Sequence, residues 1–253
     1  MPVQLQQQQH VTQLILGHPP ANAMTLALFE SLSAQLKTLA NDKNTRVVII
    51  RGQGDKSFSA GFDLSEAASS GVVHRFAQEV CNQIEAFPKP VIAAINGYAL
   101  GGGCEIALSC HIRMMIDQPK AVIGLPESNL GVLPVWGGTQ RLPRLIGKAK
   151  ALEMMCFSHK ISAREAQRIG LVDYIFAPEN FDEEVSAYAQ ALAKRPPLAV
   201  AAILRAMYQG EQEGLSKGLA SELEEVVKLG TSKDAMEGIQ AFFQKREPVF
   251  TGE

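Results

Sequence analysis

The segment from Pro90 to Cys104 carries no charged side chain and is rich in Gly, and it restricts the possible folds more than any other part of the sequence. It is shorter than the ~20 apolar residues that a membrane-spanning helix needs. A segment of this kind is therefore expected in the core of a folded domain. The chain has 253 residues, which suits one large domain, or one domain with an appendage, around a sizeable core.

Strand and helix patterns alternate in the first half of the chain. Strands are predicted at Val11–Leu16, Val47–Ile50, Pro90–Ile95 and Ile112–Ile116. Helical apolar stripes precede the second and third of these strands, formed by Leu28, Phe29, Leu32, Leu36 and Leu39 and by Phe76, Val80, Ile84 and Phe87. Continuous apolar strands joined by helices predict β-α-β crossovers and a sheet that is covered on both faces. The fold class is therefore α/β.

Strand signals nearly vanish after Gly138, while helix signals multiply. A capping box begins at Ser162. Helical patterns follow at residues 182–193, 198–208, 215–229 and 232–245. No Ser/Gly-rich linker and no internal repeat separates a second core. We expect a core with the active site over residues 1–195 and a helical region over residues 196–253.

Charge and cysteine usage exclude several classes of function. The formal net charge is -2, which gives no support for binding to nucleic acid or to an anionic membrane. The four cysteines form no C-x-x-C pair, and the five histidines lack the spacing of metal ligands. The N-terminus lacks the basic and apolar regions of a secretory signal. We expect a cytoplasmic protein with neither a metal nor a cofactor.

Two loops rich in small residues each follow a predicted strand. The first is Phe58–Asp63, and the second, Asn96–Glu105, leads into a helix-like segment. Free backbone N–H groups and the positive end of a helix dipole predict an anion site there. Neither the Lys-Ser/Thr of a phosphate-binding Walker loop nor the third glycine of a dinucleotide fingerprint is present. A transient enolate oxygen fits this loop better than a phosphate, because Glu105 would repel a permanent anion.

Glu127 provides a second carboxylate, in the turn Gly124-Leu-Pro-Glu, and two carboxylates can divide the roles of acid and base. Structural alternatives remain for each feature. The glycines could serve close helix–sheet packing, Glu127 could be a solvated turn residue, and Asp63 could cap a helix that begins near Leu64. A structural role is expected for His111, and Cys104 is expected to pack as a small apolar residue.

Three motifs occurring together closely resemble the crotonase superfamily, and within it the enoyl-CoA hydratases. They are Ser-Ala-Gly-Phe-Asp-Leu from Ser59, Lys-Pro-Val-Ile-Ala-Ala-Ile-Asn-Gly-Tyr-Ala-Leu-Gly-Gly-Gly-Cys-Glu from Lys89, and Leu-Pro-Glu followed by Gly-Gly-Thr-Gln-Arg-Leu up to Leu142. The resemblance extends from about Val11 to the Phe-Phe-Gln-Lys-Arg-Glu-Pro-Val-Phe near the C-terminus. It implies a spiral of ββα units with C-terminal helices that form trimers, often paired into hexamers.

The resemblance also implies roles for individual residues. The backbone N–H groups of Ala60 and Gly102 would form the oxyanion hole for an acyl-CoA thioester. The substrate-binding residues would be Ala60, Gly61, Phe62, Asp63 and Gly102. Coenzyme A is part of the substrate in this family. Phe242 and Lys245 would border a substrate site in the assembled oligomer.

The implied reaction is the addition of water to a trans-2-enoyl-CoA, which gives a 3-hydroxyacyl-CoA. Glu105 is assigned as the base because the helix dipole favours its ionised form, and Glu127 is assigned as the proton donor. The family usually has Pro-Gly-x-Gly-Gly where this chain has Pro134-Val-Trp-Gly-Gly, so Val135 and Trp136 alter the water site and the acyl pocket. Isomerisation, another specialised lyase or hydrolase reaction, and non-catalytic binding of CoA thioesters therefore remain alternatives.

Overall fold

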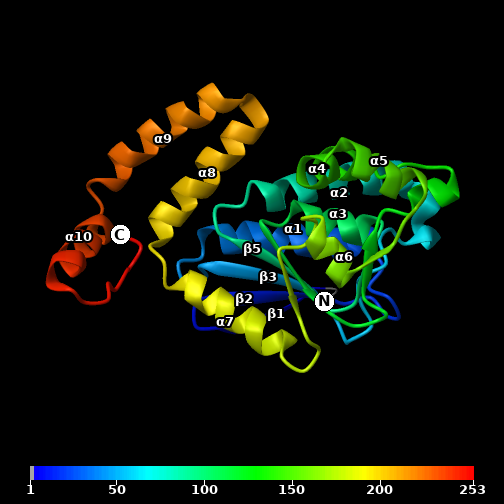
Figure 1. Ribbon diagram of the computed structural model, residues 1–253, viewed down its shortest axis with the longest axis horizontal. Coiled ribbons are helices and arrows are strands. Elements are labelled where there is room, and N and C mark those ends of the chain that lie inside the picture. The colour runs from blue at the N-terminus through cyan, green and yellow to red at the C-terminus, as the bar shows by residue number, and fades with distance from the viewer. Residues whose placement is uncertain (1–2) are drawn as a thin grey trace.

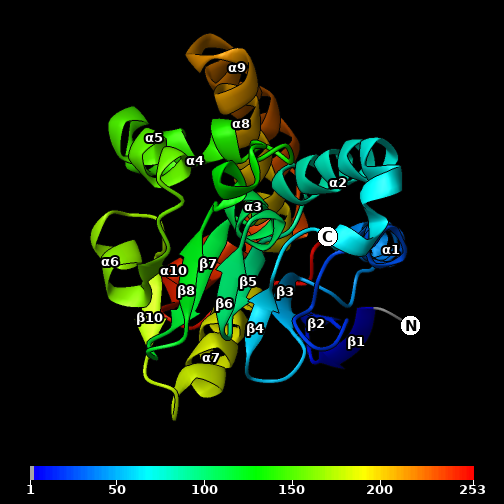
Figure 2. The same ribbon diagram turned by 90° about the vertical axis from the view of Figure 1, so that its right-hand side faces the viewer.

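The computed structural model describes residues 3–253 and contains two β-sheets (Figures 1 and 2). The six-stranded sheet has the order β1-β2-β3-β5-β7-β10, and the four-stranded sheet has the order β4-β6-β8-β9. The strands of the larger sheet are β1 (Val3–Gln8), β2 (Val11–Leu16), β3 (Val47–Gly52), β5 (Val91–Ile95), β7 (Ile112–Ile116) and β10 (Tyr174–Phe176). Those of the smaller sheet are β4 (Ser57–Ser59), β6 (Tyr98–Leu100), β8 (Val122–Gly124) and β9 (Ile161–Ser162).

Helices cover both faces of the larger sheet. The helices that precede residue 170 are α1 (Leu26–Asn41), α2 (Ser70–Glu85), α3 (Gly102–Ser109), α4 (Gly138–Ile146), α5 (Lys148–Cys156), α6 (Ala163–Arg168) and the 3₁₀ helices η1 (Leu64–Ser69) and η2 (Glu127–Leu130). One core is formed by buried residues of α1, α2 and α3 against the inner face of the sheet. Helix α7 (Phe181–Ala193) covers the opposite face through Phe181, Val185 and Ala189. The apolar strands are thus buried on both sides, as predicted.

The chain repeats a ββα unit, in which one strand joins each sheet before a helix returns. Strands β3 and β4 lead to α2, and β5 and β6 lead to α3. The expected first crossover is also present, because β2 pairs in parallel with β3 and places Val11 opposite Val47. The spiral of ββα units implied by the family resemblance is confirmed. Simple crossovers alone would have placed every strand in one sheet.

The C-terminal helices extend away from the sheets. Helices α8 (Pro197–Glu213) and α9 (Leu215–Leu229) form an antiparallel pair, and α10 (Lys233–Gln244) follows at the end where α8 begins and α9 ends, opposite the α8–α9 turn (Figure 1). The pair packs closely, since a Cβ atom added to Gly218 would lie 2.9 Å from the Cα of Gly210. Within residues 3–253, no helix combines the length and apolarity needed to cross a membrane.

His111 has the structural role that was expected. Its Nδ1 accepts a hydrogen bond of 2.9 Å from the Val91 N–H, and its Nε2 lies 3.2 Å from the Glu85 carbonyl oxygen. The imidazole thereby ties the start of β5 to the end of α2. Desolvation lowers the pKa of His111, which keeps the ring neutral in this position.

Candidate active site

Strand β6 delivers the glycine triplet to the start of α3. Gly101 adopts a φ of +55°, a conformation that glycine reaches without steric cost, and α3 begins at the next residue. Glu105 therefore lies in the first turn of α3, where its side chain is only 2% exposed. The sharp turn places a carboxylate at the positive end of a helix, inside the protein.

Two backbone donors hold the Glu105 carboxylate. Oε1 accepts hydrogen bonds from the Trp136 N–H at 2.7 Å and from the Gly138 N–H at 2.8 Å. Burial, with a smaller contribution from the nearby charge of Glu127, raises the pKa of Glu105 to about 7, and the hydrogen bonds from Gly138 and Trp136 act against this rise. These two donors stabilise the ionised form of Glu105 at a buried position.

The carboxyl group of Glu127, at the start of η2, lies at the same glycine turn. Among residues 3–253, no pair of backbone N–H groups from another loop donates to it, as Trp136 and Gly138 do to Glu105. A Cβ atom added to Gly101 would lie 3.1 Å from Glu127 Oε1, so the carboxyl group packs against the glycine turn. Oε2 is buried and has no hydrogen-bond partner within the described chain. Burial raises the pKa of Glu127 to about 7. The solvated turn that the isolated Pro-Glu suggested is therefore wrong, and the two carboxyl groups converge as predicted.

The structure contradicts Ala60 as a free oxyanion donor and leaves Gly102 available. The Ala60 N–H donates to the carbonyl oxygen of Ala21 at 3.0 Å. Neither the N–H of Phe62 nor that of Gly102 donates a hydrogen bond within residues 3–253. Gly61 lies against the N–H of Gly102, because a Cβ atom added to Gly61 would be 2.8 Å from Gly102 N. The free donors near the turn are therefore those of Phe62 and Gly102.

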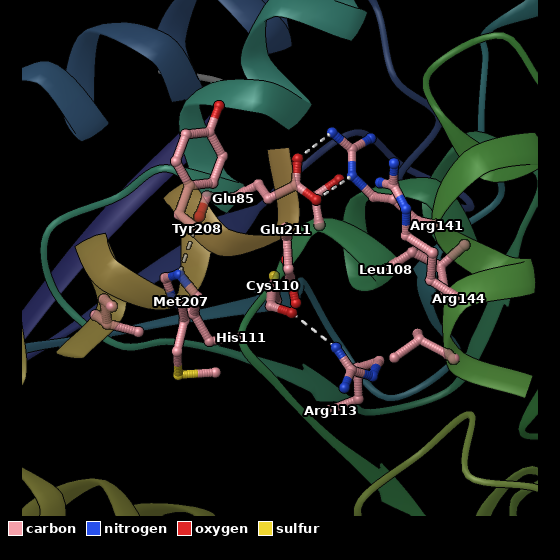
Figure 3. Close-up of a pocket in the computed structure, with 13 residues that line it drawn as sticks. Glu85, Leu108, Cys110, His111, Arg113, Arg141, Arg144, Met207, Tyr208 and Glu211 are labelled. Carbon is pink, nitrogen blue, oxygen red and sulfur yellow. Dashed lines mark hydrogen bonds and ion pairs between the residues drawn. The ribbon is translucent and has the colours of Figure 1, made fainter. Parts of the chain in front are cut away.

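Arg141, on α4, fixes the loop of residues 134–138 through a hydrogen bond to its main chain. Arg141 is 7% exposed, and its Nη1 donates to the Trp136 carbonyl at 2.8 Å. Its other nitrogens make a bidentate pair with Glu85 at 3.1 and 2.8 Å, which Figure 3 shows at the rim of a neighbouring pocket. Nη2 also donates to Asn82 Oδ1 at 2.7 Å. Because Arg141 holds the Trp136 carbonyl, the N–H groups of Trp136 and Gly138 are directed toward Glu105.

Arg141 belongs to the Gly-Gly-Thr-Gln-Arg motif, but its role was missed in the sequence. The motif gave a signal only through the resemblance. Its partners Glu85 and Asn82 gave none, because they lie on α2 at an ordinary helical spacing. Their function depends on how α2 packs beside α4, and no local sequence pattern reports that packing.

Val135 occupies the loop without backbone strain. It is absent from the residues with positive φ, and its carbonyl accepts a hydrogen bond of 3.1 Å from Gln78 Nε2. The Val135 N–H donates no hydrogen bond within residues 3–253. The loss of glycine at this position therefore costs the loop no left-handed conformation, and Val135 keeps a free donor for a water molecule.

The Trp136 indole fills the space beside Gly102. The side chain is 1% exposed, and a Cβ atom added to Gly102 would lie 1.8 Å from its Cζ3. The ring of Phe29 packs edge-on at a centroid distance of 4.9 Å, and Nε1 donates to His74 Nδ1 at 3.1 Å. The His74 ring in turn contacts Phe62 at 4.7 Å. Position 102 therefore requires glycine for packing as well as for any role of its N–H.

The remaining candidates have mainly structural positions. Asp63 caps η1 by accepting from the Ser65 N–H, and it lies 3.3 Å from His18. Hydrogen bonds from Ser65 lower the pKa of Asp63. Burial raises the pKa of Cys104 well above its usual value, which disfavours a thiolate. Within residues 3–253, no group of His, Cys, Asp and Glu side chains could hold a metal ion.

Phe242 and Lys245 lie at the end of α10, far from Glu105 of the same chain (Figure 1). Phe242 is 78% exposed. A single chain does not bring these two residues to its own site, so their expected contribution requires a second chain and stays a prediction.

Known proteins share this architecture over the full length of the chain. The family model for enoyl-CoA hydratase/isomerase matches residues 6–253. "Probable enoyl-CoA hydratase" of Bacillus subtilis is 42% identical, over 97% of this chain and 96% of that protein. The 2,3-dehydroadipyl-CoA hydratase of Escherichia coli is 39% identical, over 97% and 96%.

A solved structure agrees with these sequence relatives. The crystal structure of an enoyl-CoA hydratase from Bacillus anthracis superposes with a TM-score of 0.96 at 38% identity, and the match covers 100% of both chains. Both the sequence and the fold therefore place this chain with enzymes that act on acyl-CoA thioesters. The chain belongs to the enoyl-CoA hydratase/isomerase family of the crotonase superfamily.

Proposed function

We propose that the protein is an enoyl-CoA hydratase that adds water to a trans-2-enoyl-CoA to give a 3-hydroxyacyl-CoA. One observation carries the proposal: two desolvated carboxyl groups meet at one turn, and within residues 3–253 only Glu105 is held by N–H groups of a neighbouring loop, whereas Glu127 has only its own backbone N–H. Two N–H groups stabilise Glu105 as a carboxylate. Glu127 has no donor on its buried Oε2, which favours the neutral acid. A base and an acid are thus present together at neutral pH.

In the proposed reaction, Glu105 removes a proton from water while the oxygen attacks the β-carbon. Electrons move through the α-carbon to the thioester oxygen, and Glu127 then delivers its proton to the α-carbon. The free N–H of Val135, in the loop that binds Glu105, can donate a hydrogen bond to this water. The reaction consumes one water and leaves Glu105 protonated and Glu127 ionised. Both carboxyl groups return to their starting states when Glu105 releases a proton to solvent and Glu127 takes one up.

The developing enolate needs donors, and we assign them to Gly102 and Phe62 in place of Ala60. The N–H of Gly102 lies in the first turn of α3, where helical N–H groups have no intrahelical acceptor. One such donor contributes about 3 kcal/mol to the stability of an oxyanion transition state. The segment from Gly61 to Asp63 would then lie along the thioester and the adjoining part of CoA.

Exchanging each carboxyl group for an amide tests the proposal. We expect Glu105→Gln and Glu127→Gln each to lower kcat for crotonyl-CoA hydration by about 10²- to 10⁴-fold, because each removes one proton-transfer group. The loss of absorbance of the conjugated thioester measures the rate, and CoA binding measured by calorimetry shows whether the site remains intact. A near-wild-type rate in either variant, with binding intact, contradicts the proposed roles.

An isomerase needs chiefly the carboxylate at the Glu127 position, so the burial and double hydrogen bonding of Glu105 favour hydration. A panel of 2-enoyl-, 3-enoyl- and 3-hydroxyacyl-CoA substrates separates the reactions by mass, since hydration adds one water and isomerisation adds none. Isomerised product without hydrated product removes the hydratase proposal. Binding of all three thioesters without turnover supports the non-catalytic alternative.

We further propose that α8, α9 and α10 mediate a homotrimer, or a dimer of trimers. Their large apolar side chains are exposed in the single chain, including Leu223, Val227, Phe242 and Phe243, each more than 70% exposed. Many exposed large apolar side chains on one helical region typically mark a protein interface. Light scattering coupled to size-exclusion chromatography tests the assembly, and a monomer at micromolar concentration contradicts it.

A further inference from the structure

The position of the oxyanion donors divides the substrate into a solvent side and a buried side. This inference rests on the proposed function, in which the thioester oxygen binds at Gly102. The CoA moiety is large and highly charged, so it must extend toward solvent. The acyl group must therefore extend from the thioester carbon into the protein, between Glu105 and Glu127 and past them.

Trp136 occupies the buried side at that point. Its ring lies in direct contact with the Cα of Gly102, since an added Cβ atom would overlap Cζ3 at 1.8 Å. Its own backbone N–H binds Glu105, so the indole starts from the same loop that orients the base. An acyl chain that passes the two carboxyl groups therefore meets the face or edge of this indole.

The indole is fixed on several sides. Nε1 donates to His74 Nδ1, which assigns the remaining ring proton of a neutral His74 to Nε2. Desolvation lowers the pKa of His74, so the neutral ring that accepts this bond is maintained. Phe29 packs edge-on against the indole at a centroid distance of 4.9 Å. A longer acyl chain could enter only by displacing the indole from both partners.

We propose that Trp136, held by His74, forms the end of the acyl pocket and restricts the enzyme to short 2-enoyl groups such as crotonyl. Trp136 is then a specificity-determining residue, and His74 is a positioning residue that acts through it. The hydrogen bonds that the Trp136 backbone makes are independent of its side chain, so replacing the indole leaves Glu105 oriented.

Chain-length kinetics test the proposal with crotonyl-CoA and trans-2-decenoyl-CoA. We expect wild-type kcat/KM to favour crotonyl-CoA, and Trp136→Ala to shift the ratio toward decenoyl-CoA by at least about tenfold, the effect that one methylene can have in an apolar pocket. His74→Ala should shift the ratio in the same direction by less, because the indole is released but still present. Phe157→Ala removes an aromatic ring that is 70% exposed and stacks on His159, so it should leave the ratio unchanged.

Trp136 is the only tryptophan of the chain, so its fluorescence reports on the pocket of the unmodified protein. We expect butyryl-CoA to change the emission, CoA alone to leave it unchanged, and decanoyl-CoA to bind at least about tenfold more weakly. Equal affinity for the two acyl-CoAs, or equal wild-type rates with the two enoyl-CoAs, overturns the proposal. A wild-type protein that shows the expected emission changes but hydrates neither substrate refutes the hydratase proposal and leaves the pocket assignment standing.

Discussion

Replacing Glu127 by Gln should make the protein more stable at high pH while it lowers activity. Burial raises the pKa of Glu127 from 4.5 to about 7, so the ionised carboxyl group is destabilised in the folded state. The difference corresponds to about 3 kcal/mol of folding free energy. The folded protein binds more protons than the unfolded chain between these two pH values, so stability falls as pH rises from about 4.5 to about 7. An amide of the same shape is uncharged at every pH and avoids this loss.

Urea unfolding at pH 5 and pH 8 measures the effect. We expect Glu127→Gln to exceed wild type by up to about 3 kcal/mol at pH 8 and by much less at pH 5, where the wild-type side chain is mostly neutral. Glu213→Gln provides a control, because Glu213 is exposed at the end of α8. The same difference between Glu127→Gln and wild type at both pH values refutes the reasoning, because it shows that the group is not held neutral by burial.

Three further predictions follow from the site. The kcat/KM for hydration should be bell-shaped around pH 7, since Glu105 must be ionised and Glu127 protonated; a rate that keeps rising above pH 8 contradicts this. Phe62→Pro, which lacks the backbone N–H, should lose about 10²- to 10³-fold in kcat, whereas Phe62→Ala keeps the donor and most of kcat; equal losses contradict the oxyanion assignment. Arg141→Met should lower the free energy of unfolding by about 1–3 kcal/mol, because the partly buried Glu85 loses its charged partner; adding Glu85→Gln should recover stability but not activity, and recovery of both contradicts the positioning role.

The larger strands and helices could be predicted because their apolar periodicity is strong and local. The short strands of the second sheet could not, since β4 and β6 have three residues each and show no period. The first strand was missed for another reason. β1 contains mostly Gln, which lacks a strand signal, and it forms because Gln9 reverses the chain at a φ of +52° and pairs it with β2.

The carboxylates of the site could be predicted from the sequence, but their surroundings could not. Glu105 and Glu127 stand in small-residue loops next to strand ends, and that context is visible along the chain. Which backbone N–H is free depends on contacts between distant segments. The bond from Ala60 to Ala21 joins two loops that are separated by α1, so the sequence pattern gave no means of choosing between the N–H of Ala60 and that of Phe62.

The loop of residues 134–138 separates the chemistry of the site from the choice of substrate. Its contacts with the catalytic machinery use the main chain: two N–H groups bind Glu105, and the carbonyls of Val135 and Trp136 bind Gln78 and Arg141. The side chains at 135 and 136 take no part in these bonds, so a family glycine can be replaced wherever the backbone conformation needs no positive φ. Substitutions at these two positions should therefore change which acyl groups fit, while the hydrogen bonds to Glu105 remain and the type of reaction stays the same.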